Sequence, residues 1–224
     1  MQITHITIDF WNTIYKSNPD FAKHRNDHVR QYFIDSNAWP SNIELTVGEI
    51  GEVYQNTKAL VNQLEFDYGK SIPVPVKHAM FFGKLGIDTK YLTAEYFAIQ
   101  ASLFKKYPPL VMHKDTIEII SDLSKEYAVT ILSNTGMVSN SLLRNFIIDG
   151  EEEYQFSDDS VFCKPSQAFF TEYSHSMSNL KQKQNWLHIG DDYERDITPA
   201  LTMGVKAFHL TKPEDWLNIK TLLL

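Results

Sequence analysis

The 224-residue sequence has a single cysteine, no run of basic residues and no long hydrophobic stretch. One cysteine, Cys163, excludes an internal disulfide and favours a reducing compartment. A formal net charge of −7 without a basic cluster argues against a nucleic acid or an anionic membrane as partner. No segment is apolar enough to span a bilayer, and the N-terminus lacks the pattern of a secretory signal. These absences predict a soluble, cytoplasmic globular protein.

The C-terminal half alternates between strand-like and helix-like segments. Hydrophobic residues make up 43% of the chain, enough for one sizeable core or a core with a smaller subdomain. Alternation of strands and helices implies parallel strands joined by right-handed crossovers. With a first strand at 3–8, the expected strands are 128–132, 154–156, 186–189 and 205–210, and the expected helices are 116–126, 138–148, 166–177, 194–203 and one opened by Pro213.

Between the first strand and Pro108 the pattern is helical throughout. Residues 20–106 show apolar stripes at helical spacing and no convincing strand, and the stripe over 45–64 is the clearest. Thr46 and Glu49 match a capping box at the start of that stripe. Proline-containing breaks at 17–19 and 107–109 bracket the block and suit a pair of hinges. The sequence therefore predicts an all-helical insert after the first strand.

Polar residues stand where the apolar strands end. Asp9 follows the first strand, Ser133 follows the strand over 128–132, and a Gly190-Asp191-Asp192 turn follows the strand over 186–189. Open α/β sheets place their ligand crevice at the carboxyl ends of the strands, so these side chains are well placed for chemistry. Lys164-Pro165 before a helix, and Asp196 five residues after Asp191, complete the pattern.

These four motifs, in this order, resemble those of the haloacid dehalogenase (HAD) superfamily. The first motif of that family usually reads Asp-x-Asp-x-Thr; this chain keeps Asp9 and Thr13 and has Trp11 at the second aspartate. The resemblance covers the whole chain. It implies a Rossmann-like parallel-sheet core formed by 1–16 and 110–224, and a helical cap subdomain formed by 17–109.

The resemblance also implies roles for the motif residues. Asp9 would attack phosphorus and form an aspartyl-phosphate, with Ser133 and Lys164 as further catalytic groups. Mg²⁺ would neutralise the phosphoryl group of a small phosphorylated metabolite. The implied substrate-binding residues are Thr13, Asn134 and Thr135. The implied metal site comprises Asp9, the backbone carbonyl of Trp11, Asp191, Asp192 and Asp196. Of these, Asp192 would be a second ligand or a turn residue, and Asp196 would hold metal-bound water or Lys164.

Trp11 leaves three functions open. The missing aspartate is the general acid/base of the family's phosphatases, and the indole N–H does not titrate. A slow Mg²⁺-dependent phosphohydrolase, a metal-independent 2-haloacid dehalogenase and a catalytically impaired binding protein all remain. The retained acidic fourth motif favours the first. In the predicted cap, Arg25 with His24 and His28 is expected on a surface helix face, because charged helical residues are usually exposed.

Overall fold

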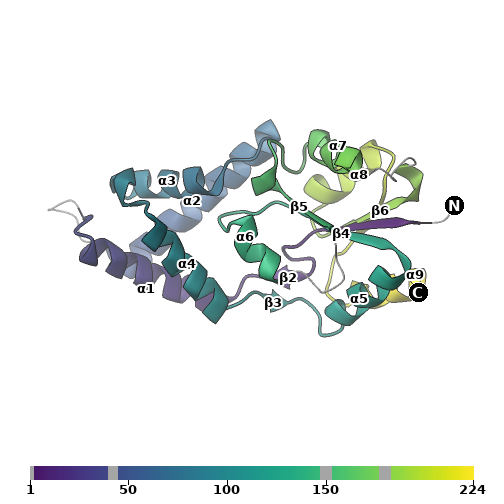
Figure 1. The fold of residues 1–224 in the computed structure, drawn as a ribbon, viewed down its shortest axis with the longest axis horizontal. Helices are drawn as coiled ribbons and strands as arrows, with labels where there is room; N and C mark the ends of the chain where they lie inside the picture. The colour runs from purple at the N-terminus through teal and green to yellow at the C-terminus, as the bar shows by residue number, and fades with distance from the viewer. Residues whose placement is uncertain (1–2, 40–44, 147–152, 177–182) are drawn as a thin grey trace.

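A five-stranded parallel sheet forms the centre of the part of the molecule drawn at the right of Figure 1. The computed structural model describes residues 3–39, 45–146, 153–176 and 183–224. The strand order is β5-β4-β1-β6-β7, which confirms the predicted α/β class. The strands are β1 (His5–Ile8), β4 (Ala128–Ser133), β5 (Glu153–Phe156), β6 (Trp186–Gly190) and β7 (Lys206–His209).

The first strand lies at the middle of this sheet, between β4 and β6. Ile8, the last residue of β1, is paired with Ile131 on one side and with Ile189 on the other, so β4 extends two residues and β6 one residue beyond it. All four residues of β1 are buried, as expected for a central parallel strand. The carboxyl ends of these three strands therefore bring the residues after Ile8, Leu132 and Ile189 to one edge of the sheet.

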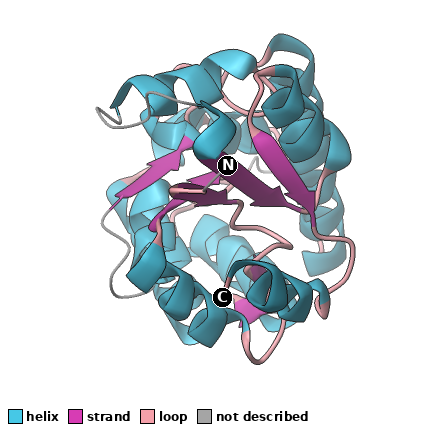
Figure 2. Ribbon diagram, turned by 90° about the vertical axis from the view of Figure 1, so that its right-hand side faces the viewer, coloured by secondary structure: helices cyan, strands magenta, loops and turns pink. Residues whose placement is uncertain are grey.

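Helices cover both faces of the sheet (Figure 2). On one face, α5 (Thr116–Glu126) and α9 (Asp215–Leu223) pack Ile120 and Trp216 against β1 and β4. On the other face, α7 (Gln167–Ser176) and α8 (Thr198–Thr202) pack Phe170 and Ala200 beside Trp186. Burial of these large apolar side chains is the main stabilising contribution to the core. None of the described helices is long and apolar enough to cross a membrane.

The segment between β2 (Tyr15–Lys16) and β3 (Leu110–Val111) forms a helical cap, at the left of Figure 1. Its helices enclose a second hydrophobic core that includes Phe33, Ile50, Phe82 and Tyr96. A two-stranded antiparallel ribbon of β2 and β3 lies where the chain enters and leaves the cap. The cap elements are α1 (Pro19–Asp35), α2 (Val47–Tyr68), α3 (Val74–Lys84), η1 (Thr89–Tyr91) and α4 (Ala94–Lys106).

Local signals placed several helix ends correctly. Thr46 and Glu49 form the predicted capping box at the start of α2, and α5 has the predicted bounds. The helix predicted over 138–148 is shorter: α6 (Asn140–Leu143) continues as the 3₁₀ turn η2 (Arg144–Phe146), and Ile148 lies outside the described residues, as does Met177 after α7.

The helix predicted over 194–203 divides into two parts. A π-helical turn, η5 (Tyr193–Ile197), precedes the five-residue α8. Pro199 has no N–H to donate to the preceding turn, which explains why one continuous α-helix does not form.

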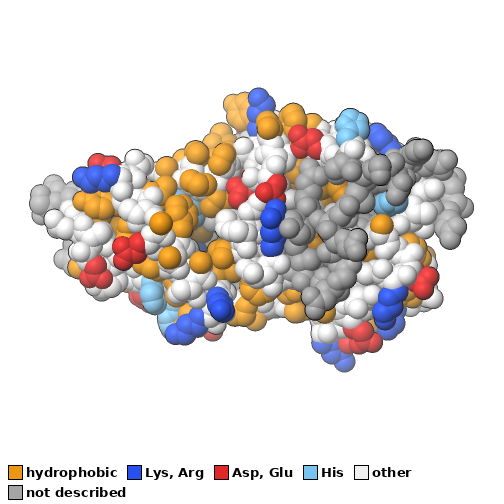
Figure 3. Space-filling model, viewed as in Figure 1, with side chains coloured by type: hydrophobic (Ala, Val, Ile, Leu, Met, Phe, Trp, Pro, Cys, Tyr) orange, Lys and Arg blue, Asp and Glu red, His pale blue; other side chains and the backbone are white. Residues whose placement is uncertain are grey.

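Charged side chains are distributed over the surface without a dominant basic patch on the face drawn in Figure 3. The coloured lysine and arginine side chains are scattered there among acidic ones, and hydrophobic side chains gather over α3 and α4 of the cap.

Candidate active site

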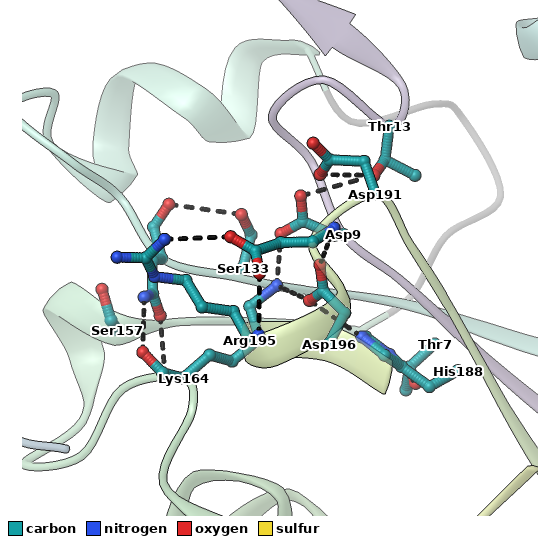
Figure 4. A network of polar contacts seen from close by, with 12 residues as sticks. Thr7, Asp9, Thr13, Ser133, Ser157, Lys164, His188, Asp191, Arg195 and Asp196 are labelled. Atoms are coloured by element: carbon teal, nitrogen blue, oxygen red, sulfur yellow. Dashed lines mark hydrogen bonds and ion pairs between the residues drawn. The ribbon is translucent and has the colours of Figure 1, made fainter. Parts of the chain in front are cut away.

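The ammonium of Lys164 lies between the carboxylates of Asp9 and Asp196 (Figure 4). All three side chains are buried, with 5% or less of each residue exposed. Burial alone would lower the pKa of Lys164, but the two carboxylates outweigh it and raise that pKa. Burial raises the pKa of Asp9, and the Lys164 charge opposes that shift. Lys164 is therefore held as a cation against the carboxylate of Asp9.

A chain of buried hydrogen bonds holds Asp196 in place. His188 Nε2 lies 3.1 Å from Asp196 Oδ1, and His188 Nδ1 lies 2.8 Å from the hydroxyl of Thr7. Trp186 Nε1 donates to the same hydroxyl at 2.7 Å. An ionised carboxylate only accepts hydrogen bonds, so Nε2–H of His188 is the donor to Asp196. Burial would raise the pKa of Asp196, but the Lys164 charge and His188 lower it.

Glycine is required at position 190 because Asp196 lies directly against it. A Cβ atom built on Gly190 would lie 2.4 Å from Cγ of Asp196, a distance that real Cβ atoms essentially never show. The close approach also allows the backbone N–H of Asp192 to donate to Asp196 Oδ2 at 3.1 Å. The close packing of Asp196 therefore explains why the fourth motif has glycine at position 190.

Thr13 connects the nucleophile candidate to the fourth motif. Its buried hydroxyl lies 3.3 Å from Asp191 Oδ1 and 3.5 Å from Asp9 Oδ2. Burial and then repulsion from Asp9 raise the pKa of Asp191 to about 6. The two carboxylates thus face each other with one hydroxyl proton between them, and added positive charge would relieve their repulsion.

The acidic cluster has the donor chemistry of a hard cation. Asp9, Asp191 and Asp196 each offer a carboxylate oxygen, and these atoms lie within 4.8 Å of one another. Mg²⁺ takes oxygen ligands and is held by one or two carboxylates, so the residues present suit it. The structure does not bring Asp192 into this cluster. Its carboxylate caps η5 and pairs with Arg195 at 2.9 Å.

The loop after β4 faces Asp9 and Lys164 from the other side of the site. Ser133 is buried, and its hydroxyl lowers the pKa of Asp9. The side-chain amide of Asn134 bonds both backbone groups of Lys164, each at 2.9 Å, so it holds the third motif against the second. Thr135 N donates to the Ser157 hydroxyl at 3.0 Å, a contact that no sequence motif indicated.

Trp11 lines the cavity above Asp9. Its side chain is half-buried and packs edge-on against Phe10, with ring centroids 5.0 Å apart. An aromatic ring therefore occupies the cavity wall where the general acid of a HAD phosphatase is expected.

The cap closes the far side of a cavity of about 320 Å³. The expectation that Arg25 lies on an exposed face of its helix is wrong. Arg25 is 4% exposed and lines this cavity with Tyr54 and Lys58 of α2. His28 is exposed as expected, and half-buried His24 stacks on Tyr107 at 4.5 Å between ring centroids. Helical spacing alone could not distinguish the cavity-facing side of α1 from its solvent-facing side.

No family model and no curated protein sequence matches this chain. Solved structures share its fold. The HAD-hydrolase YfnB of Bacillus subtilis, bound to magnesium, has a TM-score of 0.68 at 19% identity, over 99% of this chain and 100% of that one. A 2-haloacid dehalogenase of Pseudomonas syringae has a TM-score of 0.63 at 15% identity, over 100% of both chains. A HAD family enzyme of Bacteroides thetaiotaomicron, in complex with magnesium and inorganic phosphate, has a TM-score of 0.58 at 11% identity, over 97% of this chain and 98% of that one. The chain has the HAD-like fold with a helical cap.

Proposed function

We propose that the protein is a Mg²⁺-dependent phosphohydrolase that acts on a small phosphorylated metabolite through an aspartyl-phosphate on Asp9. The observation that carries this proposal is the charge of the cluster. Three carboxylates, Asp9, Asp191 and Asp196, surround one ammonium, Lys164, within the part of the chain that the structure describes. A cation and a phosphoryl group would complete such a site, whereas the HAD dehalogenases use no metal.

The residues have the following proposed roles. A carboxylate oxygen of Asp9 attacks phosphorus, and the leaving group departs with the electrons of its P–O bond. Water then attacks the same phosphorus, which releases phosphate and regenerates the Asp9 carboxylate. Lys164 neutralises Asp9 and a phosphoryl oxygen, and Ser133 with the backbone N–H of Asn134 binds the phosphoryl group. Thr13 and Thr135 complete the substrate site at its two edges.

The proposed metal ligands are Asp9, the backbone carbonyl of Trp11, and Asp191. When bound, Mg²⁺ supplies positive charge that lets the anionic nucleophile and the anionic phosphoryl group approach. Asp196 has a different proposed role, because its oxygens already accept from Lys164, His188 and the Asp192 N–H. It positions the lysine. Asp192 is assigned to the turn, where it caps η5.

A metal-independent 2-haloacid dehalogenase is the second candidate, and Trp11 is the observation that favours it. HAD dehalogenases carry an aromatic tyrosine at this position, since cleavage of a carbon–halogen bond needs no leaving-group proton. The chain also shares its fold with 2-haloacid dehalogenases. Asp191, with its pKa raised to about 6, weighs against this reading because a third carboxylate beside Asp9 serves no step of that reaction.

The deciding experiment compares 4-nitrophenyl phosphate, an acyl phosphate and 2-chloropropionate as substrates, each with Mg²⁺ and with a chelator. We expect phosphate release that requires Mg²⁺ and no chloride release. Asp191→Asn should weaken Mg²⁺ binding measured by calorimetry, and Asp158→Asn, outside the cluster, serves as its control. Chloride release with chelator present would establish the dehalogenase. Mg²⁺ binding without turnover of any substrate would establish a binding protein.

A further inference from the structure

The described residues of the cap wall of the active-site cavity include two cations and no acid. Arg25 of α1 and Lys58 of α2 line the cavity that contains Asp9. None of the described cap residues that line it is aspartate or glutamate. Among the described lining residues, the carboxylates all come from the core: Asp9, Asp191, Asp192 and Asp196. Lys164 and Arg195 also line the core end, where the four carboxylates outnumber the two cations, whereas the described cap lining is basic.

Arg25 is a buried cation. Its Nε and Nη2 atoms donate to the neutral side-chain oxygen of Asn26 at 3.1 and 2.7 Å. Its guanidinium carbon lies 3.3 Å from the centroid of the Tyr54 ring. Among the described residues, no carboxylate lies within 4.0 Å of this guanidinium. A ring face and an amide oxygen compensate a buried positive charge only in part, so the free protein retains an unneutralised cation there.

Lys58 adds a second positive charge on the same wall. It is one helical turn after Tyr54 on α2, half-buried, and forms no ion pair with any described residue. Burial lowers its pKa, and the nearby charge of Arg25 lowers it further. Two like charges placed together in a partly desolvated cavity repel each other. Binding of an anion between them would relieve both the repulsion and the missing hydrogen bonds.

We propose that Arg25 and Lys58 form a second anion-binding subsite, and that the substrate is a small phosphorylated carboxylic acid. This inference rests on the proposed phosphohydrolase function, which assigns the phosphoryl group to the Asp9 end of the cavity. The carboxylate of the same molecule then lies against the cap. Asn26 occupies the N–H of Nε and one N–H of Nη2, so the Nη1 group and the second N–H of Nη2 would be the donors to a carboxylate. A cavity of about 320 Å³ limits the ligand to a small metabolite.

The test uses phosphonates that cannot be hydrolysed. A series of ω-phosphonoalkanoic acids of increasing chain length is titrated calorimetrically into the protein with Mg²⁺, each beside its neutral carboxamide. At the best length the acid should bind about 10- to 100-fold more tightly than the amide, as for other charge-assisted hydrogen-bonded pairs. Arg25→Gln and Lys58→Gln should each bring this ratio toward one. Lys23→Gln removes an exposed charge from the same helix α1 and should preserve it.

Two outcomes would overturn the subsite. Equal binding of acid and amide at every length means that the cap wall does not recognise a carboxylate. If Arg25→Gln weakens acid and amide equally, Arg25 contacts the phosphoryl end or only supports the fold. Turnover of 4-nitrophenyl phosphate by the unmodified protein is a separate readout. Preference for the acid without any turnover would retain the subsite and reject the phosphohydrolase function, and turnover without preference would do the reverse.

Discussion

The ammonium of Lys77 donates a hydrogen bond of 2.7 Å to the backbone carbonyl of Gly136. Lys77 lies on cap helix α3, and Gly136 lies in the core loop that also carries Ser133 and Thr135. The same ammonium forms an ion pair with Glu65 of α2 at 2.8 Å, and both side chains are buried. A charged group at the junction of three elements therefore fixes the cap against the loop that faces Asp9.

Breaking this ion pair from one side should be strongly destabilising. Glu65→Gln leaves Lys77 buried without a counterion, and we expect the free energy of unfolding to fall by about 3–5 kcal/mol. The double variant Glu65→Gln/Lys77→Met should recover part of that loss, because no unpaired charge remains. Denaturant titration measures both. Asp122→Asn, at the solvent-accessible pair with Lys125, is the matched control and should cost far less, because solvent screens this pair. Equal effects at the two pairs would contradict this account.

The stability of the cap should depend on pH through His78. This buried ring bonds the Tyr96 hydroxyl at 2.9 Å and the Met137 carbonyl at 3.0 Å, and burial lowers its pKa from 6.5 to about 4. The folded state thus favours the neutral ring. The contribution of neutral His78 to the free energy of unfolding is complete above pH 6.5. It is lost as the pH falls toward 4, and the loss amounts to at most about 3 kcal/mol.

The variant His78→Gln tests this dependence. The difference in unfolding free energy between wild type and variant should shrink as the pH falls from 6.5 to 4, because only the wild type gains a proton on unfolding in that range. His175→Gln, at an exposed histidine of α7, is the control for replacement of an imidazole by an amide. If the difference for His78→Gln stays constant over this range, folding does not lower the pKa of His78.

Much of the fold and the position of the site could be predicted from local signals. Strand-forming runs that end in Asp9, Ser133 and Gly190 are contiguous in sequence, and parallel strands necessarily bring such ends to one sheet edge. Lys164 could be assigned to the predicted site only through the family resemblance, since no apolar strand directly precedes it. Its position depends on Asn134, whose side chain bonds the Lys164 backbone across the cavity.

The contacts that could not be predicted join segments distant in sequence, or bury residue types that are usually exposed. Charged residues on helices are usually exposed, so neither the burial of Arg25 nor the Lys77–Glu65 pair follows from periodicity. Both arise from the packing of cap helices on each other and on the core loop. His188 was expected only as part of a buried strand. Its link to Asp196 requires the turn at Gly190 to bring the aspartate back onto β6.

Asp9→Asn should abolish hydrolysis of 4-nitrophenyl phosphate while the circular dichroism spectrum stays unchanged. An amide is a poor nucleophile, so the covalent step has no route. Lys164 keeps Asp196 as a counterion in the variant, which limits the loss of stability. Asp27→Asn, at an exposed position of α1, is the control and should retain full activity. Full activity in Asp9→Asn would show that another residue attacks phosphorus.

Trp11 should make hydrolysis depend steeply on the leaving group. Its ring lines the cavity beside Asp9 and packs on Phe10, and the indole cannot donate a titrating proton to a departing oxygen. An alkyl alkoxide must then leave unprotonated, whereas an aryl or acyl phosphate leaves as a stabilised anion. We expect aryl and acyl phosphates to outpace sugar phosphates by much of the roughly 10²–10⁴-fold that general acid catalysis supplies.

The variant Trp11→Asp restores the carboxylate of a HAD phosphatase and should narrow that gap, measured as kcat/KM for one aryl and one alkyl phosphate in both proteins. Trp11→Phe is the matched control, because it keeps an aromatic ring in the cavity wall without supplying an acid, and it should leave the gap wide. Loss of the large ring creates space in the wall, so thermal unfolding of all three proteins shows whether Trp11→Asp has also disturbed the fold. If wild type hydrolyses both substrates equally well, another group protonates the leaving oxygen, and half-buried His24 beside Tyr107 is then the first residue to replace.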